Sequence, residues 1–309
     1  MWISLKGLEN PISFDGAEAL VAVLEKVLRG WQVREVGEDA KAHGAPRIRL
    51  RLGARGYERR SPWIEAGKAL VLPDPVDAVC DLLLDIERAY VEDAPARGEA
   101  VLSILHAAAV EMGPGKSGPG EAGQDDDKGL VVFPSTHATG KSLLTVALAQ
   151  AGHRVFADDQ VPIIPGTPGA QTPGQQTMGV APGFLPRLRR PLPDGLDAEL
   201  AAFVRRHAGP ESSNFRYVDL DARGLAPLGT RAPVKGVVLL ERVDGAEPVL
   251  APATEAQVLK ACVLQSFGRT PNALAVLDTL HAMVQDAKCV TLTYADAAQA
   301  VALLEETFA

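Results

Sequence analysis

The spacing of hydrophobic and polar positions predicts two helices and a strand in the first third of the chain. Apolar residues recur at helical spacing over 14–31 and 72–93, with Asp15 expected to cap the first of these helices. Residues 46–53 alternate apolar and basic side chains, as a half-exposed strand does. We assign these segments to a smaller N-terminal α+β unit, residues 1–95.

The pattern changes after residue 95, where two apolar runs flank a polar segment. Residues 113–128 are rich in glycine, proline and charge, which predicts a flexible loop. Periodicity alone allows either a buried strand or a helix at 100–112. Because such a loop can join neighbouring strands, we favour a strand and expect 101–111 and 129–134 to pair as a hairpin. Residues 96–309 are expected to form the second domain.

The remaining segments favour strands alternating with helices, and therefore an α/β core. A helix is expected from Lys141 to Gly152, followed by a strand over 153–159. Residues 164–215 are rich in proline and glycine and predict a long irregular segment with one helix, at 196–209. Strands are then expected at 232–244 and 288–295 and helices at 253–267, 273–287 and 296–309, the last capped by Asp296.

Composition narrows the classes of function. The 309 residues are 47% hydrophobic and 23% charged, so a sizeable core is expected. A net charge of −8 argues against nucleic acid as a partner. Three widely spaced cysteines indicate a reducing compartment. Without a signal-like start or a long apolar run, we expect a cytoplasmic protein with no membrane partner.

The most informative motif joins the strand at 129–134 to the following helix. It ends in Gly140-Lys141-Ser142, the end of a phosphate-binding (Walker A) loop, although Ser135 stands where the strict motif has its first glycine. Backbone N–H groups, the helix N-terminus and Lys141 would bind phosphates, and the Ser142 hydroxyl would ligate Mg²⁺. The expected nucleotide contacts are Ser135, Thr136, His137, Ala138, Thr139, Gly140, Lys141, Ser142 and Leu143.

The alternative is an ordinary helix start with an exposed lysine and a capping serine, and His137 is expected to be a solvated loop residue.

Asp158 and Asp159 follow the next strand. If that strand and the strand before the loop are parallel neighbours, both carboxylates lie near the phosphates. One could hold Mg²⁺ and the other could accept a proton from a hydroxyl, although the alternative is that they begin a turn. Because adjacent strand residues face opposite sides, we expect one of them to face the substrate.

The segment GKSLLTVALAQAGHRVFADD, residues 140–159, resembles the HPr kinase/phosphorylase family of the PEP-carboxykinase-like P-loop fold, and ILHAAAV at 104–110 resembles its upstream histidine strand. The resemblance implies ATP and Mg²⁺ as cofactors. It implies that Lys141 binds phosphates, Ser142 and Asp158 hold the metal, Asp159 acts as the base and His106 lies near the transferring phosphoryl group. Without the resemblance, His106 would be interpreted as a buried strand histidine.

The sequence departs from that family at Ser135 and Ala138, which replace glycines, and lacks an obvious acidic metal ligand further along. Arg187, Arg189, Arg190 and Arg216 are candidate phosphate-binding arginines that spacing alone does not distinguish. We therefore expect an ATP- and Mg²⁺-dependent kinase acting on a serine hydroxyl of a protein or peptide other than HPr itself, with homo-oligomerisation left open. The alternatives are a nucleotide-binding regulator without transfer and a small-molecule kinase of the same fold.

Overall fold

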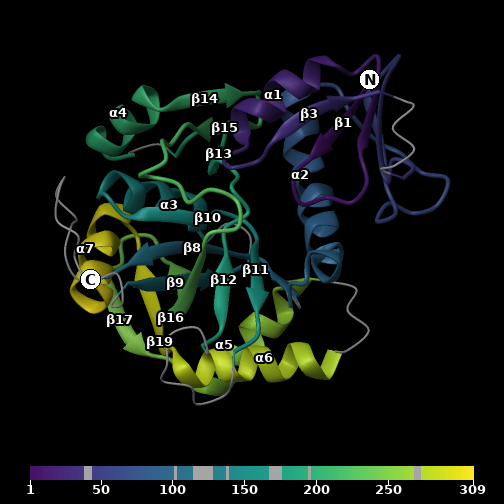
Figure 1. Cartoon of the computed structure of the whole chain (residues 1–309). Coiled ribbons are helices and arrows are strands. Elements are labelled where there is room, and N and C mark those ends of the chain that lie inside the picture. Colours follow the sequence, from purple (N-terminus) through teal and green to yellow (C-terminus); the bar gives the residue numbers. More distant parts are fainter. Residues whose placement is uncertain are drawn as a thin grey trace.

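The computed structural model describes residues 1–37, 44–100, 103–113, 128–136, 139–166, 176–193, 196–267 and 273–309, so nearly all of the predicted flexible loop 113–128 lies outside the described residues. Over this part of the chain the protein is a mixed α/β structure with a six-stranded, a ten-stranded and a three-stranded sheet (Figure 1). None of its described helices combines the length and apolar character needed to cross a membrane.

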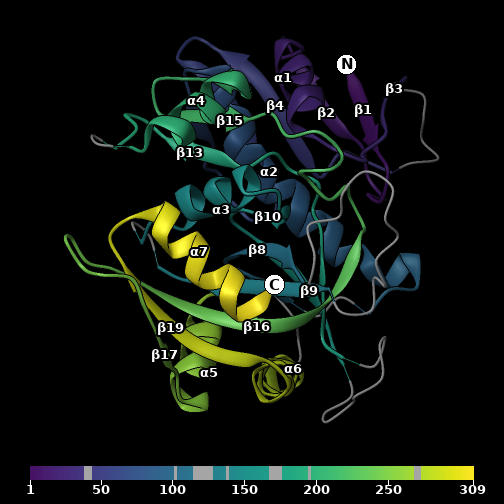
Figure 2. The same ribbon diagram turned by 90° about the vertical axis from the view of Figure 1, so that its left-hand side faces the viewer.

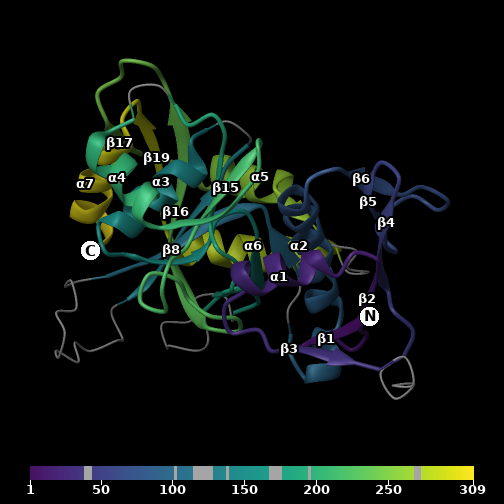
Figure 3. The same cartoon turned by 90° about the horizontal axis from the view of Figure 1, so that it is seen from above.

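The N-terminal part of the chain forms the six-stranded sheet, in the order β3-β1-β2-β4-β5-β6. Figure 3 shows this sheet to one side of the molecule, with α1 and α2 between it and the rest. The elements are β1 (Trp2–Leu5), β2 (Ile12–Asp15), α1 (Ala19–Val27), β3 (Val33–Val36), β4 (Ile48–Gly53), β5 (Gly56–Arg60), β6 (Leu70–Leu72) and α2 (Pro75–Glu92).

The predicted helices and the alternating strand are confirmed here, but the predicted cap is wrong. Asp15 ends β2, and α1 begins after Glu18, whose side chain makes no capping hydrogen bond. In α2 the cap is Asp74, which accepts from the backbone N–H groups of Val76 and Asp77. The boundary at residue 95 between two domains stays a prediction.

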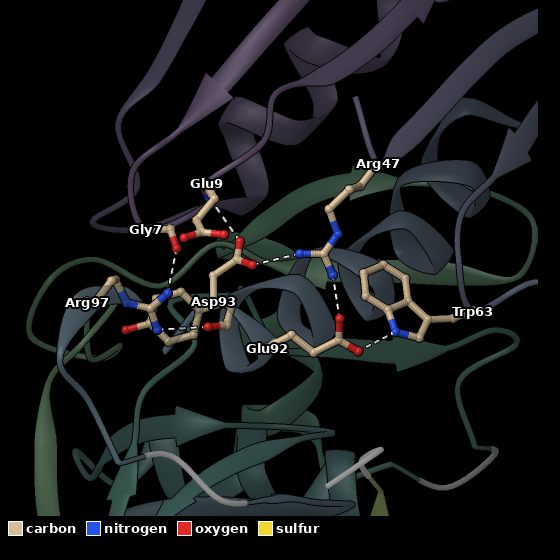
Figure 4. Close-up of polar contacts among 8 residues, drawn as sticks. Gly7, Glu9, Arg47, Trp63, Glu92, Asp93 and Arg97 are labelled. Carbon is tan, nitrogen blue, oxygen red and sulfur yellow. Dashed lines mark hydrogen bonds and ion pairs between the residues drawn. The ribbon is translucent and has the colours of Figure 1, made fainter. Parts of the chain in front are cut away.

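Helix α2 is held by side chains at its carboxyl end (Figure 4). Asp93 accepts from the backbone N–H of Glu9 over 2.9 Å and from the Arg47 guanidinium over 2.6 Å. Arg47 also pairs with Glu92, which accepts from the Trp63 indole over 2.8 Å. Beyond the helix, a short 3-10 turn (Ala94–Arg97) follows. Loops of the N-terminal sheet therefore fix the position of α2.

The ten-stranded sheet has the order β10-β8-β9-β16-β12-β11-β7-β18, with β19 beside β16 and β17 beside β19. The predicted hairpin is confirmed for β8 and β9, from Ala107 opposite Pro134 to Met112 opposite Gly129. The run before it divides at His106, because β7 pairs with β11 and β18 instead. The strands are β7 (Ser103–Leu105), β8 (Ala107–Met112), β9 (Gly129–Pro134), β10 (Arg154–Ala157), β11 (Val161–Ile164), β12 (Met178–Val180), β16 (Arg231–Arg242), β17 (Val249–Pro252), β18 (Ser266–Phe267) and β19 (Lys288–Tyr294).

Helices cover both faces of this sheet, with α3 and α7 on one face and α5 and α6 on the other (Figures 1 and 2). Successive residues of β8 and β9 therefore enter different cores: Ala108 and Val131 pack on the α3 side, whereas Ala109 and Val132 pack on the α5–α6 side. The predicted helices are confirmed as α3 (Lys141–Gln150), α5 (Glu255–Leu264), α6 (Ala273–Asp286) and α7 (Ala297–Phe308), and Asp296 caps α7 as expected.

Of the segment predicted to be irregular, 164–215, residues 167–175 and 194–195 lie outside the described residues, and the described remainder is more regular than expected. It holds the predicted helix, α4 (Ala198–Arg206), but also β12, which joins the large sheet, and most of a three-stranded sheet. That small sheet consists of β13 (Arg187–Arg189), β15 (Phe215–Val218) and β14 (Ala208–Glu211). The prediction of a long irregular segment is therefore wrong for these residues, which form strands of only three or four residues each.

Candidate active site

The predicted phosphate loop leaves the carboxyl end of β9 and opens α3. Gly140 is the N-cap of α3 and adopts the left-handed conformation, with φ of 83°. A Cβ atom on Gly140 would lie 2.6 Å from the Tyr294 hydroxyl, so an L side chain is opposed both by the backbone and by a neighbour. The Tyr294 hydroxyl donates to the carbonyl of Thr139 over 2.8 Å, and Thr139 donates to the carbonyl of Thr136 over 3.2 Å.

Lys141 is buried although it opens a helix, which disfavours the alternative of an exposed lysine. Its Nζ lies 3.4 Å from the carbonyl of Ser135, across the loop. Burial lowers the pKa of Lys141, and the charges of Asp159 and Asp158 oppose that effect. Five other predicted contacts line the same cavity as Lys141, namely Thr136, Thr139, Gly140, Ser142 and Leu143, whereas Ser135 is buried and does not line it. His137 and Ala138 lie outside the described residues.

Asp158 and Asp159 follow β10, whose carboxyl end is at the same edge of the sheet as that of β9. The two strands are not neighbours, which corrects the expectation: both run antiparallel to β8, which lies between them. Nor do the two carboxylates divide between opposite faces, because both follow the end of the strand and line the cavity with Lys141. The strand order therefore differs from the expected one, yet the carboxylates and the lysine share one cavity.

Asp158 is the more buried of the two, and its Oδ1 atom is buried without a hydrogen-bond partner. Its Oδ2 accepts from the backbone N–H of Arg187 over 3.0 Å. Burial raises the pKa of Asp158, and the nearby hydroxyl of Ser142 acts in the opposite direction. An unpartnered carboxylate oxygen beside a serine hydroxyl fits a Mg²⁺ ion, which takes few protein oxygens and completes its shell with water and phosphate.

Across the described residues, no three His, Cys, Asp or Glu side chains group so that they could hold a metal ion by themselves. Asp158 and Ser142 alone therefore do not complete a metal site. They fit a metal ion whose remaining ligands come from a bound phosphate. Asp158 and Ser142 are the residues that would hold it.

Arg187 distinguishes itself from the other candidate arginines by its contact with the second carboxylate. Its guanidinium donates to Oδ2 of Asp159 over 3.0 Å. Arg189 lies two residues further along β13, on the same face of the strand, and also lines the cavity. Arg190 and Arg216 instead pair with Glu211, outside the cavity.

His106 lies where the β7–β8 run divides, and it faces the same carboxylate. Its Nδ1 is 3.7 Å from Oδ1 of Asp159, and its ring meets that of Phe267 edge to face at 5.8 Å between centroids. The sequence-predicted residues His106, Lys141, Ser142, Asp158 and Asp159 thus line one cavity. Its volume is about 540 Å³, within the range of small-molecule sites.

The cavity has two distinguishable ends. At one end, Leu143 and Arg242 are shared with a smaller hollow at the start of α7. At the other end, a small hollow against α2 shares five lining residues with the cavity: Leu84, Asp158, Asp159, Gln160 and Arg187. We call the second of these the α2 end.

Sequence reasoning missed several cavity residues: Leu84 and Arg88 of α2, Arg242 of β16, and Phe215 and Phe267. For Arg242 a signal existed, because it ends the long apolar strand beside the strand that carries the phosphate loop. For Leu84 and Arg88 the signal is weaker: they lie one helical turn apart on a helix that the pattern assigned to the other unit.

Glu87, on the same helix, is another residue that the sequence did not single out. It is buried, and its Oε1 has no hydrogen-bond partner. Burial raises the pKa of Glu87 well above its ordinary value, and the charge of Asp159 raises it further, whereas Arg187 and Arg88 act in the opposite direction. Glu87 lines the small hollow against α2 together with Asp159 and Arg187, and its burial favours the protonated form of its carboxyl group.

Comparison with known proteins gives little beyond this geometry. No protein-family model matches the chain, and no curated protein matches its sequence. Among solved structures, the Hpr(Ser) kinase/phosphatase from Coxiella burnetii is a distant neighbour, with 12% sequence identity and a TM-score of 0.28. The match covers 66% of this chain and 92% of that chain. A TM-score at this level establishes neither a shared fold nor a shared activity.

Proposed function

We propose that the protein is an ATP- and Mg²⁺-dependent kinase that transfers the γ-phosphoryl group to a serine hydroxyl of a protein or peptide. The observation that carries the proposal is the shared cavity of Lys141, Ser142, Asp158 and Asp159 at the tip of α3. A buried lysine, a helix N-terminus and an unpartnered carboxylate oxygen are the groups that a magnesium–triphosphate requires.

On the nucleotide side, the residues of the loop supply position and charge. The backbone N–H groups at the start of α3 and the Nζ of Lys141 would bind phosphate oxygens, and Tyr294 holds the loop by its hydrogen bond to Thr139. Asp158 and Ser142 would hold Mg²⁺, which neutralises negative charge on the phosphates when bound.

On the acceptor side, Asp159 is proposed to accept the proton of the serine hydroxyl. The serine oxygen forms a bond to the γ-phosphorus, the bond between that phosphorus and the bridging oxygen of ADP breaks, and the proton passes to the carboxylate of Asp159. Arg187 and His106 lie against the two oxygens of that carboxylate and would orient it.

The test is transfer of label from γ-labelled ATP to a library of serine peptides, with Asp159→Asn as the diagnostic variant. The expected result is transfer by the wild-type protein in the presence of Mg²⁺ and a loss of roughly a hundredfold or more in kcat for the variant. Asp286→Asn, at the exposed end of α6, is the matched control and should behave as wild type. Equal transfer by Asp159→Asn would remove the base from the proposal.

A second candidate function, a nucleotide-binding regulator without transfer, is favoured by the ion pair between Arg187 and Asp159. A carboxylate that is already paired at 3.0 Å is a weaker base than a free one. Calorimetry with ATP and Mg²⁺ separates the candidates: binding without transfer to any peptide, and without hydrolysis, supports the regulator. Absence of binding would contradict both candidates.

A further inference from the structure

The α2 end of the cavity carries a positive charge that the proposed transfer does not use. Arg187 is engaged with Asp159, but Arg88 also lines the cavity, one helical turn along α2 from Leu84 at this end. The carboxylate nearest to Arg88 is Asp85, at 3.7 Å, and Asp85 already pairs with Arg59 at 3.3 Å. The Arg88 side chain is 35% exposed, whereas that of Asp85 is fully buried.

The cavity as a whole has the opposite charge from the chain. Among the described residues, its lining includes five basic side chains, Arg88, Lys141, Arg187, Arg189 and Arg242, and two acidic side chains, Asp158 and Asp159. The chain has a net charge of −8. Lys141 and Arg242 lie by the phosphate loop, where a triphosphate would balance them. Arg88 comes from α2, one helical turn after Leu84, which lies at the α2 end of the cavity.

Arg88 belongs to a helix that is held along its length. At the amino end, Asp77 accepts from the Ser212 hydroxyl over 2.5 Å and from the Asn214 amide over 2.6 Å. At the carboxyl end, the contacts of Glu92 and Asp93 bind α2 to the N-terminal sheet (Figure 4). A guanidinium on a fixed helix is a preorganised site for an anionic group.

We propose that the serine acceptor carries a carboxylate side chain close to its hydroxyl and that Arg88 binds this carboxylate. This inference rests on the proposed kinase function and adds the chemical class of its acceptor. Leu84, one helical turn before Arg88, supplies apolar contact beside the charge, and Phe267 contributes an aromatic wall near His106. The N-terminal part of the chain thereby selects the acceptor, while the α3 end of the cavity binds the nucleotide.

The experiment compares serine peptides that differ only in a flanking glutamate, glutamine or lysine, by kcat/KM for label transfer from ATP. The wild-type protein is expected to prefer the glutamate peptide by roughly tenfold or more over the glutamine peptide. Arg88→Glu should reverse the order in favour of the lysine peptide, and Arg88→Gln should remove the preference. In both variants the KM for ATP should stay within about twofold of wild type.

The controls exclude a general effect of charge or folding. Arg205→Glu changes an exposed arginine of α4 outside the cavity and should leave the preference intact. Arg242→Gln should raise the KM for ATP without changing the order of the peptides. Circular dichroism and thermal unfolding identify a variant that fails to fold, and Arg88→Gln then replaces Arg88→Glu, since it introduces no negative charge beside Asp85.

Each outcome bears on the proposal. Equal kcat/KM for the three peptides, or a glutamate preference that Arg88→Glu leaves unchanged, overturns it while the kinase function stands. If no peptide is labelled, binding of the fluorescent glutamate peptide is measured with a non-hydrolysable ATP analogue and Mg²⁺. If the wild-type protein binds the glutamate peptide and Arg88→Glu does not, recognition of the carboxylate by Arg88 stands and the proposed phosphoryl transfer is overturned. If the wild-type protein does not bind the peptide, the proposal of an acidic acceptor is overturned.

Discussion

The hydroxyl of Tyr294, the last residue of β19, donates a hydrogen bond to the carbonyl of Thr139 in the loop before α3. The two residues are 155 positions apart in the chain. This contact, together with the left-handed Gly140 beside it, fixes the loop from β19, which is separated from β9 by β16. The shape of the proposed phosphate site therefore depends on a residue near the C-terminus.

Gly140→Ala is expected to lower stability and nucleotide affinity together. The left-handed backbone costs an alanine about 1–2 kcal/mol, and its Cβ would also displace the Tyr294 hydroxyl. Gly152→Ala is the matched control, because Gly152 has φ of 98° but nothing within 4 Å of an added Cβ. Urea unfolding and calorimetry with ATP measure the two effects. Equal losses of ATP affinity in the two variants would show that the contact between the added Cβ atom and the Tyr294 hydroxyl does not cause the loss.

Lys141→Met is expected to separate stability from binding. Because burial lowers the pKa of Lys141, the charged ammonium is held at a cost, and an apolar side chain of similar length removes that cost. We therefore expect a thermal midpoint equal to or above that of wild type and ATP affinity lower by roughly a hundredfold. Lys68→Met, on the exposed surface, should change neither quantity. A variant that keeps wild-type affinity would remove Lys141 from the phosphate site.

Glu87→Gln is expected to change how stability depends on pH. Since burial, followed by the charge of Asp159, raises the pKa of Glu87 well above its ordinary value of 4.5, the folded protein keeps a proton that the unfolded chain releases. The contribution of Glu87 to stability is therefore fully present below that value and is lost as pH rises toward the folded pKa. A glutamine does not titrate, so the variant should gain stability relative to wild type as pH rises.

Urea unfolding of both proteins from about pH 5 to about pH 8 measures the difference in free energy of unfolding. Arg187 and Arg88, which lower the pKa of Glu87, reduce the size of the effect without changing its sign. A difference that is constant across this range would mean that Glu87 titrates in the folded protein as it does in the unfolded chain.

Arg47→Met should destabilise the protein through the contacts drawn in Figure 4. The substitution leaves the nearly buried Asp93 without its 2.6 Å partner and removes the guanidinium from the face of Trp63. The expected loss is about 1–3 kcal/mol in the free energy of unfolding. Arg51→Met tests a similar residue whose pair with Asp15 is exposed on both sides, and should cost less than about 0.5 kcal/mol.

The sequence allowed the long elements to be predicted because their own residues specify them. The helices α5 and α7 begin at capping residues, Thr254 and Asp296, and then follow the helical period. β16 and β19 are long apolar runs. The strands that escaped prediction, such as β12 and β13, have three residues each and no pattern of their own, since they are stabilised by pairing with distant strands.

The site was predicted in part for the same reason. Lys141, Ser142 and the two aspartates are adjacent to elements whose ends are readable, so their common edge could be inferred. The sequence also predicted the strand that became β8, but not that it lies between β9 and β10. Leu84 and Arg88 were missed because helical spacing predicts which residues share one face of a helix, but not which part of the protein that face packs against. Arg187 was among four candidates, and the choice needed its contact with Asp159, which no spacing in the sequence predicts.

The contacts at the two ends of α2 determine what a chimera between two related chains would exchange. Its amino end is bonded to the β14–β15 turn through Asp77, and its carboxyl end to the first sheet through Asp93. A chimera joined after residue 95 would import a foreign helix, and with it a foreign wall for the cavity. Exchange of the first 95 residues between related chains should therefore carry the choice of acceptor along with it, leaving the nucleotide requirement behind.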